Sequence, residues 1–359
     1  MKISYFIGYS GGRLDFNGAR VELPVERVRL ADRLGYYGVF TAESYGSDAL
    51  TPLAYLAGQT KQIRLGTALM IIPARPPVAA ATAVQTIDQL AGGGRFIAGL
   101  GTSGPQVVEG WYGEPWGKPV TRMREYIAVM RKAFARQEPM NYQGKEFNLP
   151  YRGPGESGFA KPLRSFLHMD PSLPIWMGCG GEASVRLCGE VADGWIPQSF
   201  LPHEMAKPKA WIEEGFRRAG GGKSWKDFEI HAIVPTVVSD DVSAGLRKLK
   251  RQVAMYVGGM GAKEKNFHKD RMVEHGHADV AERLQELVLA GRLEEAIDAV
   301  PDEVIDATAL VGPPARIRER YRPWADSIAT GLIIRTEQDE AIRLMAEISE
   351  AVTAKEAWA

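Results

Sequence analysis

The sequence is poor in several features that would define a class of protein. Its 359 residues include only two cysteines, Cys179 and Cys188, and their C-x8-C spacing matches no common zinc-binding pattern. We expect both to be free thiols in a reducing cytoplasm. The 44 basic and 44 acidic residues leave a formal net charge of zero, which provides no electrostatic basis for binding nucleic acid or an anionic membrane.

Other absences exclude further classes of protein. No apolar run reaches the roughly 18 residues of a transmembrane helix, and the first residues lack the basic and apolar regions of a signal peptide. The six histidines have no metal-ligand spacing, and most are expected to be solvated or partly buried residues. No Gly-x-Ser-x-Gly nucleophile elbow occurs. We therefore expect a cytoplasmic protein without a metal site, in which a cofactor performs the difficult chemistry on a small-molecule substrate.

What the chain does contain is a regular alternation of short apolar runs and amphipathic segments. Helical spacing of apolar residues separates runs that are typical of buried strands, which predicts a parallel sheet with right-handed crossovers. The eight strand-like runs lie at 2–8, 38–42, 63–72, 95–100, 174–178, 194–197, 228–238 and 331–335. Eight strands alternating with helices predict a (β/α)8, or TIM-like, barrel, and we expect a single domain over residues 1–359.

Two segments exceed what such a repeat needs, and we expect both to be insertions. After a helix over 121–136, which follows the fourth strand, residues 138–172 are rich in proline, glycine and aromatics. We interpret them as a long excursion over the mouth of the barrel. A polar helical stretch over 266–300 is extra between the seventh and eighth strands, and the last helix is expected over 339–357.

The most informative stretch is Ile97–Gly113, with the sequence I-A-G-L-G-T-S-G-P-Q-V-V-E-G-W-Y-G. Its apolar run ends in Gly101-Thr102-Ser103-Gly104, before a proline that suits the first turn of a helix. The glycines allow the backbone to turn and to approach a ligand closely. The two hydroxyls follow the carboxyl end of a strand, which is where α/β folds bind ligands. An ordinary turn between strand and helix explains the same residues, so this stretch alone leaves both interpretations open.

A second glycine-rich turn, Gly178-Cys179-Gly180-Gly181-Glu182, follows the fifth strand. Exposed backbone N–H groups at the start of the next helix, with the helix dipole behind them, bind phosphate well. The order of residues fits neither the Walker pattern nor G-x-G-x-x-G. The turn therefore predicts a phosphate-bearing cofactor of unnamed class, with a purely structural turn as the alternative. At the end of the second strand, Glu43 is either a base or simply an acid at a helix start.

These motifs resemble the luciferase-like flavin-dependent superfamily, and specifically its branch that uses the deazaflavin coenzyme F420. The likeness covers nearly the full length and rests on G-x-x-x-x-F-T-A-E-S-Y-G-S-D at 35–48, I-R-L-G-T-A-L-M-I-I-P-A-R-P-P at 63–77, Q-L-A-G-G-G-R-F-I-A-G-L-G-T-S-G-P-Q-V-V-E-G-W-Y-G at 89–113, G-E-V-A-D-G-W at 189–195 and Y-V-G-G-M-G at 256–261. It implies a TIM-like barrel that is usually oligomeric, so we expect a homo-oligomer such as a homodimer.

The resemblance also implies where the cofactor binds. The ring would lie against strands two to four, and the phosphate at the turn after strand five. The implied cofactor-binding residues are Glu43, Ser44, Ala68, Leu69, Gly101, Thr102, Ser103, Gly104, Cys179, Gly180, Gly181 and Glu182. Relatives in the F420 branch carry a non-prolyl cis peptide and a bulge in the third strand, at the position of Ala68–Leu69. By position, Glu43 corresponds to the family's acidic residue after strand two and is the candidate catalytic residue.

Two departures from the sugar-phosphate dehydrogenases of this branch argue against their substrate. Ser44 stands where those enzymes have a histidine, and Gly104 stands where they have a glutamate after strand four. The family's acid/base therefore cannot be carried over to this chain. Three functions remain: hydride transfer between F420 and a small organic substrate, monooxygenation with reduced FMN and oxygen, and cofactor binding without catalysis.

Overall fold

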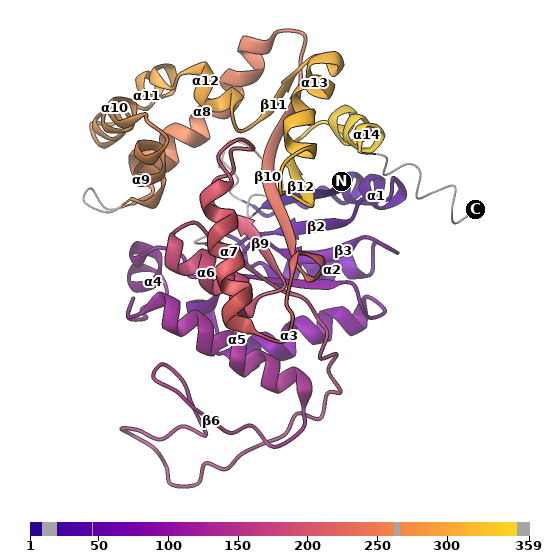
Figure 1. Cartoon of the computed structure of the whole chain (residues 1–359), viewed down its shortest axis with the longest axis vertical. Helices are drawn as coiled ribbons and strands as arrows, with labels where there is room; N and C mark the ends of the chain where they lie inside the picture. The colour runs from indigo at the N-terminus through magenta and orange to yellow at the C-terminus, as the bar shows by residue number, and fades with distance from the viewer. Residues whose placement is uncertain (9–19, 45, 262–265, 350–359) are drawn as a thin grey trace. The chain divides into compact units, whose positions relative to one another are not determined.

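The structure is a computed structural model that describes residues 1–8, 20–44, 46–261 and 266–349. Eight parallel strands alternating with helices make a TIM-like (β/α)8 fold, as predicted (Figure 1). The chain divides into two compact units, which are described separately. The first comprises 1–39, 199–205 and 231–359, and the second comprises 40–198 and 206–230.

The first unit is built around strands that pair in parallel. Strand β12 (Gly331–Arg335) pairs with β1 (Lys2–Gly8) and with β10 (Glu229–Val238), and the end of β10 also pairs with β11 (Leu310–Gly312). The helices of this unit are α1 (Val25–Arg33), α8 (Val242–Gly259), α9 (Phe267–Glu274), α10 (Ala278–Leu289), α11 (Leu293–Ala299), α12 (Asp302–Asp306), α13 (Pro314–Ala325) and α14 (Asp339–Ile348).

Helices α8 to α12 enclose an apolar cluster of their own, which includes Leu249, Leu284 and Ile297. The helical stretch predicted over 266–300 is three helices, α9 to α11. The first begins after Asn266, whose side chain accepts hydrogen bonds from the next helical N–H groups. Helix α14 ends at Ile348, and residues 350–357 of the predicted last helix lie outside the described residues.

The second unit contains the strands on which the candidate site is built. Strand β5 (Phe96–Gly101) pairs in parallel with β3 (Arg64–Thr67), β4 (Met70–Ile71) and β8 (Ile175–Cys179), and β8 pairs with β9 (Gly194–Pro197). Every residue of β5 is buried, as expected for a parallel strand covered on both faces. The other elements are the end of β2 (Gly38–Thr41), α2 (Leu50–Ala57), η1 (Ile72–Ala74), α3 (Pro77–Leu90), α4 (Pro105–Gly110), α5 (Pro119–Ala135), α6 (Glu182–Val191), α7 (Ala206–Ala219) and η2 (Trp225–Asp227).

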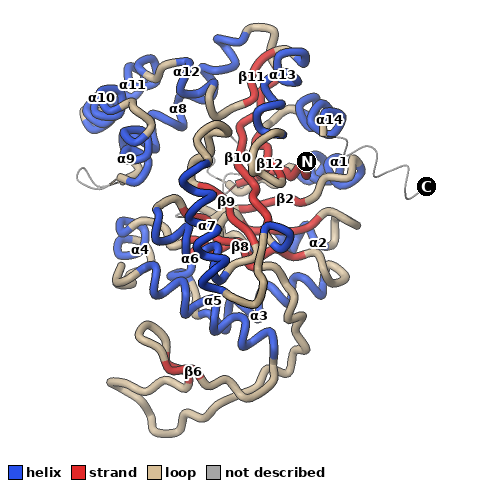
Figure 2. The backbone as a smooth tube through the Cα atoms, viewed as in Figure 1, coloured by secondary structure: helices blue, strands red, loops and turns tan. Residues whose placement is uncertain are grey.

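The segment between α5 and β8 is almost entirely loop, apart from the hairpin of β6 (Tyr142–Gln143) and β7 (Asn148–Leu149) (Figure 2). Side chains of α3 donate hydrogen bonds to its carbonyls, and Glu125 of α5 accepts three from its backbone N–H groups. The segment therefore lies along α3 and α5, where helix side chains satisfy its backbone. The prediction that it covers the mouth of the barrel stays a prediction.

Within the described ranges, no helix combines the length and the apolar content needed to cross a membrane.

Candidate functional site

The third barrel strand is interrupted at Ala68–Leu69, between β3 and β4. Leu65 pairs with Phe96 of β5, whereas Met70 pairs with Leu100, so five steps along strand three match four along β5. One extra residue therefore bulges out of the ladder. The peptide bond of Ala68–Leu69 is cis. The cis bond and the bulge predicted at this position are both confirmed.

The half-buried side chain of Leu69 lies against the carboxyl ends of β5 and β8. A Cβ atom added to Gly178 would lie 1.9 Å from Leu69 Cδ1, and one added to Gly101 would lie 2.8 Å from the same atom. At Gly99 an added Cβ would meet the carbonyl oxygen of Thr67 at 1.8 Å. A side chain at any of these three positions would clash with strand three, so only glycine fits there. These glycines therefore allow strand three to seat an apolar side chain on two adjacent strands.

The turn after β5 is made by a residue that the sequence did not single out for it. Ser103 has φ 59°, in the left-handed region that residues other than glycine rarely adopt. Gly101 belongs to β5, and Gly104 is extended, with φ −102° and ψ 161°. Helix α4 then begins at Pro105, as predicted. The prediction that the two glycines make the turn is wrong, because their role is packing and entry into the helix.

The turn after β8 ends at Gly181, directly before α6, and Gly181, Glu182 and Ala183 are exposed. Among the described residues, no side chain caps this helix start. The N–H groups of Ser184 and Val185 donate to the carbonyl of Gly181, inside the first turn. The backbone donors of Glu182 and Ala183 precede them at the exposed end, which suits a phosphate. The carboxylate of Glu182 pairs with Arg186 one turn later, which reduces its repulsion of an anion.

The two cysteines lie on β8 and α6, and both are free thiols, as predicted. The carbonyl of Cys179 accepts a hydrogen bond from Trp195 Nε1 at 3.0 Å, which anchors the end of β8. Burial raises the pKa of the Cys188 thiol well above its usual range, and the nearby Cys179 adds to the shift. Cys188 therefore stays a neutral thiol that packs in the core.

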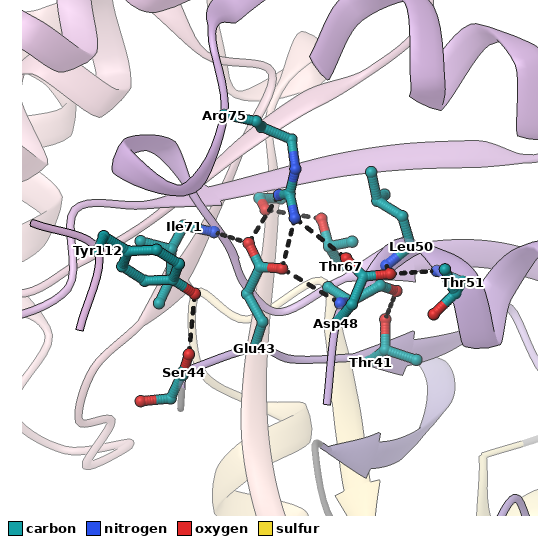
Figure 3. Close-up of polar contacts among 12 residues, drawn as sticks. Thr41, Glu43, Ser44, Asp48, Leu50, Thr51, Thr67, Ile71, Arg75 and Tyr112 are labelled. Atoms are coloured by element: carbon teal, nitrogen blue, oxygen red, sulfur yellow. Dashed lines mark hydrogen bonds and ion pairs between the residues drawn. The ribbon is translucent and has the colours of Figure 1, made fainter. Parts of the chain in front are cut away.

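Glu43 is buried, and both of its carboxylate oxygens are bonded twice (Figure 3). Oε1 accepts from the N–H of Ile71 and from Arg75 Nη1, each at 2.7 Å. Oε2 accepts from Arg75 Nη2 at 2.8 Å and from the N–H of Ala49 at 3.2 Å. The backbone N–H of Glu43 donates to the carbonyl of Leu69 at 3.2 Å. Glu43 thus ties the end of β2 to α2 and to the bulged strand, which favours a positioning role over proton transfer.

Arg75 extends this network to the start of α2. Its Nη2 lies 3.0 Å from Asp48 Oδ1, and Asp48 Oδ2 accepts from the N–H groups of Leu50 and Thr51. Burial alone would lower the pKa of Arg75, but hydrogen bonds and charge from Glu43 outweigh it and raise the pKa. Burial would raise the pKa of Asp48, but bonds from Thr51 and Leu50 and the charge of Arg75 lower it. Arg75 and Asp48 are therefore held in their ionised forms.

Tyr112 closes the network on the side of α4. Its hydroxyl donates to the carbonyl of Ser44 at 2.8 Å (Figure 3). Burial, and then the negative charge of Glu43, raise the pKa of this phenol, so it stays neutral. Ser44, which is predicted to bind the cofactor beside Glu43, is thus fixed through its backbone carbonyl.

Arg75, Asp48 and Tyr112 were not predicted from the sequence as site residues. Arg75 could have been identified from the sequence. A buried glutamate needs a counter-charge, and Arg75 is a basic residue inside the strand-three motif. No local pattern identified Tyr112. In the part of the chain that the structure describes, no three His, Cys, Asp or Glu side chains gather as a metal site.

Residues 1–331 match the family model described as luciferase-like monooxygenase. The chain is 39% identical over 349 residues to a Mycobacterium tuberculosis protein named as a provisionally assigned coenzyme F420-dependent oxidoreductase, covering 97% of this chain and 99% of that one. Its fold resembles a coenzyme F420-dependent tetrahydromethanopterin reductase from Methanopyrus kandleri, with TM-score 0.76, 20% identity and coverage of 97% and 98%. It also resembles an F420-dependent secondary alcohol dehydrogenase in complex with an F420–acetone adduct, with TM-score 0.74, 16% identity and 98% coverage of both chains. These two structures show the fold alone.

Proposed function

The chain belongs to the luciferase-like monooxygenase family, and from this premise we propose that it is an oxidoreductase that transfers a hydride between coenzyme F420 and a small carbonyl compound or the corresponding alcohol. The F420-dependent relative at 39% identity supports the coenzyme. The acetone adduct of a neighbour in fold motivates the substrate class.

The observation that carries the proposal is the seating of Leu69 on Gly101 and Gly178 at the carboxyl ends of two adjacent strands. A half-buried apolar side chain in that place would offer an apolar contact to one face of an aromatic ring. The exposed start of α6 follows one of the same two strands, so ring support and phosphate donors share β8. These residues fit a cofactor that has both an aromatic ring and a phosphate.

We assign the chain's own residues as follows. Ala68–Leu69 would support the ring, and Gly180, Gly181 and the helix start would hold the phosphate. When bound, F420 would supply a hydride donor or acceptor that the side chains lack. The Glu43–Arg75 pair keeps the support in place through the carbonyl of Leu69 and the N–H of Ile71. The hydroxyls of Thr102 and Ser103 are available to orient a small polar substrate.

The second candidate is an FMN-dependent monooxygenase, which the family's own description favours. A flavin ring would use the same apolar support, and its phosphate the same helix start. The two candidates differ in their cofactor and in their need for oxygen. The third function left open by the sequence is cofactor binding without catalysis, which predicts no turnover with either cofactor.

The purified chain should be titrated with F420 and with FMN, following fluorescence. Turnover should then be measured without oxygen, with reduced F420 and a panel of small ketones, and with oxidised F420 and secondary alcohols. We expect F420 to bind more tightly than FMN and the reaction to be insensitive to oxygen. Turnover that needs reduced FMN and oxygen would establish the monooxygenase, and F420 binding with no turnover would establish the binding protein.

The phosphate assignment has its own test. Gly180→Val should weaken F420 binding about tenfold or more, because a side chain there crowds the backbone donors. Gly58→Val is the matched control, because a Cβ at Gly58 meets nothing within 4 Å. Equal affinity in the two variants would place the phosphate elsewhere. We also propose a homodimer, which light scattering of the purified chain would test.

A further inference from the structure

The hydroxyl of Tyr112 is connected by hydrogen bonds to the candidate ring support, and all the residues involved belong to the second unit. The backbone N–H of Tyr112 donates to the carbonyl of Val107 at 3.1 Å, which fixes the residue at the end of α4. Its hydroxyl donates to the carbonyl of Ser44 at 2.8 Å (Figure 3). The N–H of the preceding residue, Glu43, donates to the carbonyl of Leu69 at 3.2 Å. Two hydrogen bonds and two adjacent residues therefore connect the phenol to the backbone that would support the ring.

The other ionisable groups of this network are already committed to structure. Glu43 accepts four hydrogen bonds. Arg75 pairs with Glu43 and with Asp48, and a guanidinium does not lose its proton in a protein. Tyr126 is fully buried, and its hydroxyl donates to the carbonyl of Arg75 at 3.1 Å. Tyr112, by contrast, is half-buried, so among the described members of the network its hydroxyl is the one placed to give a proton to a molecule that enters from solvent.

The reaction proposed above requires such a proton. Reduction of a carbonyl adds a hydride to carbon and a proton to oxygen, but the positions after strands two and four offer Ser44 and Gly104 instead of an acid. The hydroxyl of Tyr112 reaches the first of these positions from the segment after β5. In (β/α)8 enzymes, catalytic residues come from the segments that follow the strands. Tyrosine is also one of the side chains that serve as general acids.

We propose that Tyr112 is the proton donor of this oxidoreductase in carbonyl reduction, held in place by the carbonyl of Ser44, an inference that rests on the proposed function. The substrate carbon takes the hydride as the C=O π bond breaks, and the substrate oxygen takes the proton of the Tyr112 hydroxyl as that O–H bond breaks. The reduced coenzyme is the reductant and ends oxidised, and the substrate ends as an alcohol. The phenolate of Tyr112 then regains a proton from water. Alcohol oxidation requires the phenolate to take the proton instead.

The surroundings of the phenol favour its protonated form. Burial and the negative charge of Glu43 raise the pKa of Tyr112, the positive charge of Arg75 opposes them, and Asp48 adds to the rise. On α4 itself the ionisable side chain is Glu109. The phenol is therefore protonated at neutral pH, as a donor must be. Reduction should be lost only at alkaline pH, where the phenol ionises.

The test uses the full chain with reduced F420 and a ketone from the panel above. Tyr112→Phe keeps the ring and removes the proton, so it should lower kcat about 100-fold, the lower end of general acid–base effects, and leave F420 affinity within about twofold. Tyr151→Phe is the matched control, because the hydroxyl of this exposed tyrosine also donates to a backbone carbonyl, that of Pro154 at 3.0 Å. It should keep the wild-type kcat.

A second variant separates proton donation from a structural role. Replacement of Tyr112 by difluorotyrosine keeps the hydroxyl and its bond to Ser44 but makes the phenol more acidic. We expect the pH at which kcat for ketone reduction falls on the alkaline side to move to lower values. A tyrosine that only holds the backbone of Ser44 would leave that pH unchanged.

The outcomes distinguish the donor from the proposed function. Wild-type kcat in Tyr112→Phe, an equal loss of kcat in Tyr151→Phe, or an alkaline limit that difluorotyrosine does not move would overturn the donor and leave the proposed function intact. A wild type that binds F420 but reduces no ketone and oxidises no alcohol would overturn the proposed function and the donor with it.

Discussion

The Glu43–Arg75 pair and the Ser199–His275–Glu204 chain both join acidic to basic side chains, but they differ in burial and in the number of hydrogen bonds that hold them. In the first, the side chains are 3% and 19% exposed, and every carboxylate lone pair is engaged. In the second, the side chains of His275 and Glu204 are 21% and 45% exposed, and single hydrogen bonds connect the members. A saturated buried pair holds backbone in place, whereas single hydrogen bonds between partly exposed side chains remain accessible to water.

The largest change in stability is expected from breaking the buried pair. Glu43→Gln leaves the partly buried cation of Arg75 with Asp48 alone, and we expect the free energy of unfolding in urea to fall by about 3 kcal/mol. Glu26→Gln, which breaks an exposed pair with Arg29, is the control and should change it by less than about 1 kcal/mol. Equal losses in the two variants would mean that burial does not distinguish these pairs.

The packing around the same network gives the next effect. Gly178→Ala places a methyl group 1.9 Å from Leu69 Cδ1, and such overpacking costs about 2 kcal/mol. We expect thermal denaturation to show this loss and F420 titration to show weaker binding, since Leu69 must move. Gly58→Ala is the control with open space. Adding Leu69→Ala to Gly178→Ala should recover part of the stability, and a purely additive loss would contradict the contact.

Helix α9 carries a second histidine that contrasts with His275. Burial lowers the pKa of His268 to about 4, and its ring packs edge-on against Tyr256 at 4.6 Å. The unfolded chain binds this proton near pH 6.5, so stability is full above that pH and falls toward pH 4, by at most about 1.4 kcal/mol per pH unit. Urea titrations at pH 7 and pH 5 should show a smaller drop in His268→Gln than in the wild type. A drop of equal size in both chains would show that His268 does not contribute.

The smallest effect on stability is expected in the more exposed chain of Ser199, His275 and Glu204. Glu204 is almost half exposed, so Glu204→Gln should change the free energy of unfolding by less than about 1 kcal/mol. If its stability stays near wild type while that of Glu43→Gln falls, the two regions differ as proposed. A loss of stability as large as that of Glu43→Gln would remove the contrast.

The strands and the turns between them could be predicted from local sequence patterns. The eight strands were predicted within a few residues because a parallel strand is a short apolar run bounded by turn residues, and this signal needs no distant partner. The glycine turn after β8 was predicted for the same reason, and the structure leaves the start of α6 exposed. The residues implied by the resemblance lie in the bulge of strand three or at and just after the carboxyl ends of strands two, four and five.

Contacts between residues that are distant in the sequence could not be predicted from local patterns. The pairing of Glu43 with Arg75, the glycines that make room for Leu69, and the path of the segment after α5 depend on which side chains meet across the fold. His275 is the clearest example, because its two partners lie more than 70 residues earlier in the chain.

The sequence by itself thus determined the order of strands and helices, the turns that could bind a phosphate, and the absence of the histidine and glutamate of related sugar-phosphate dehydrogenases. Only the tertiary structure decided that Glu43 is committed to holding backbone and that His275 is joined to a serine and a glutamate. The physical reason is that periodicity and turn chemistry act between neighbours in the chain. The partners of a charge are chosen by the packing that brings distant segments together.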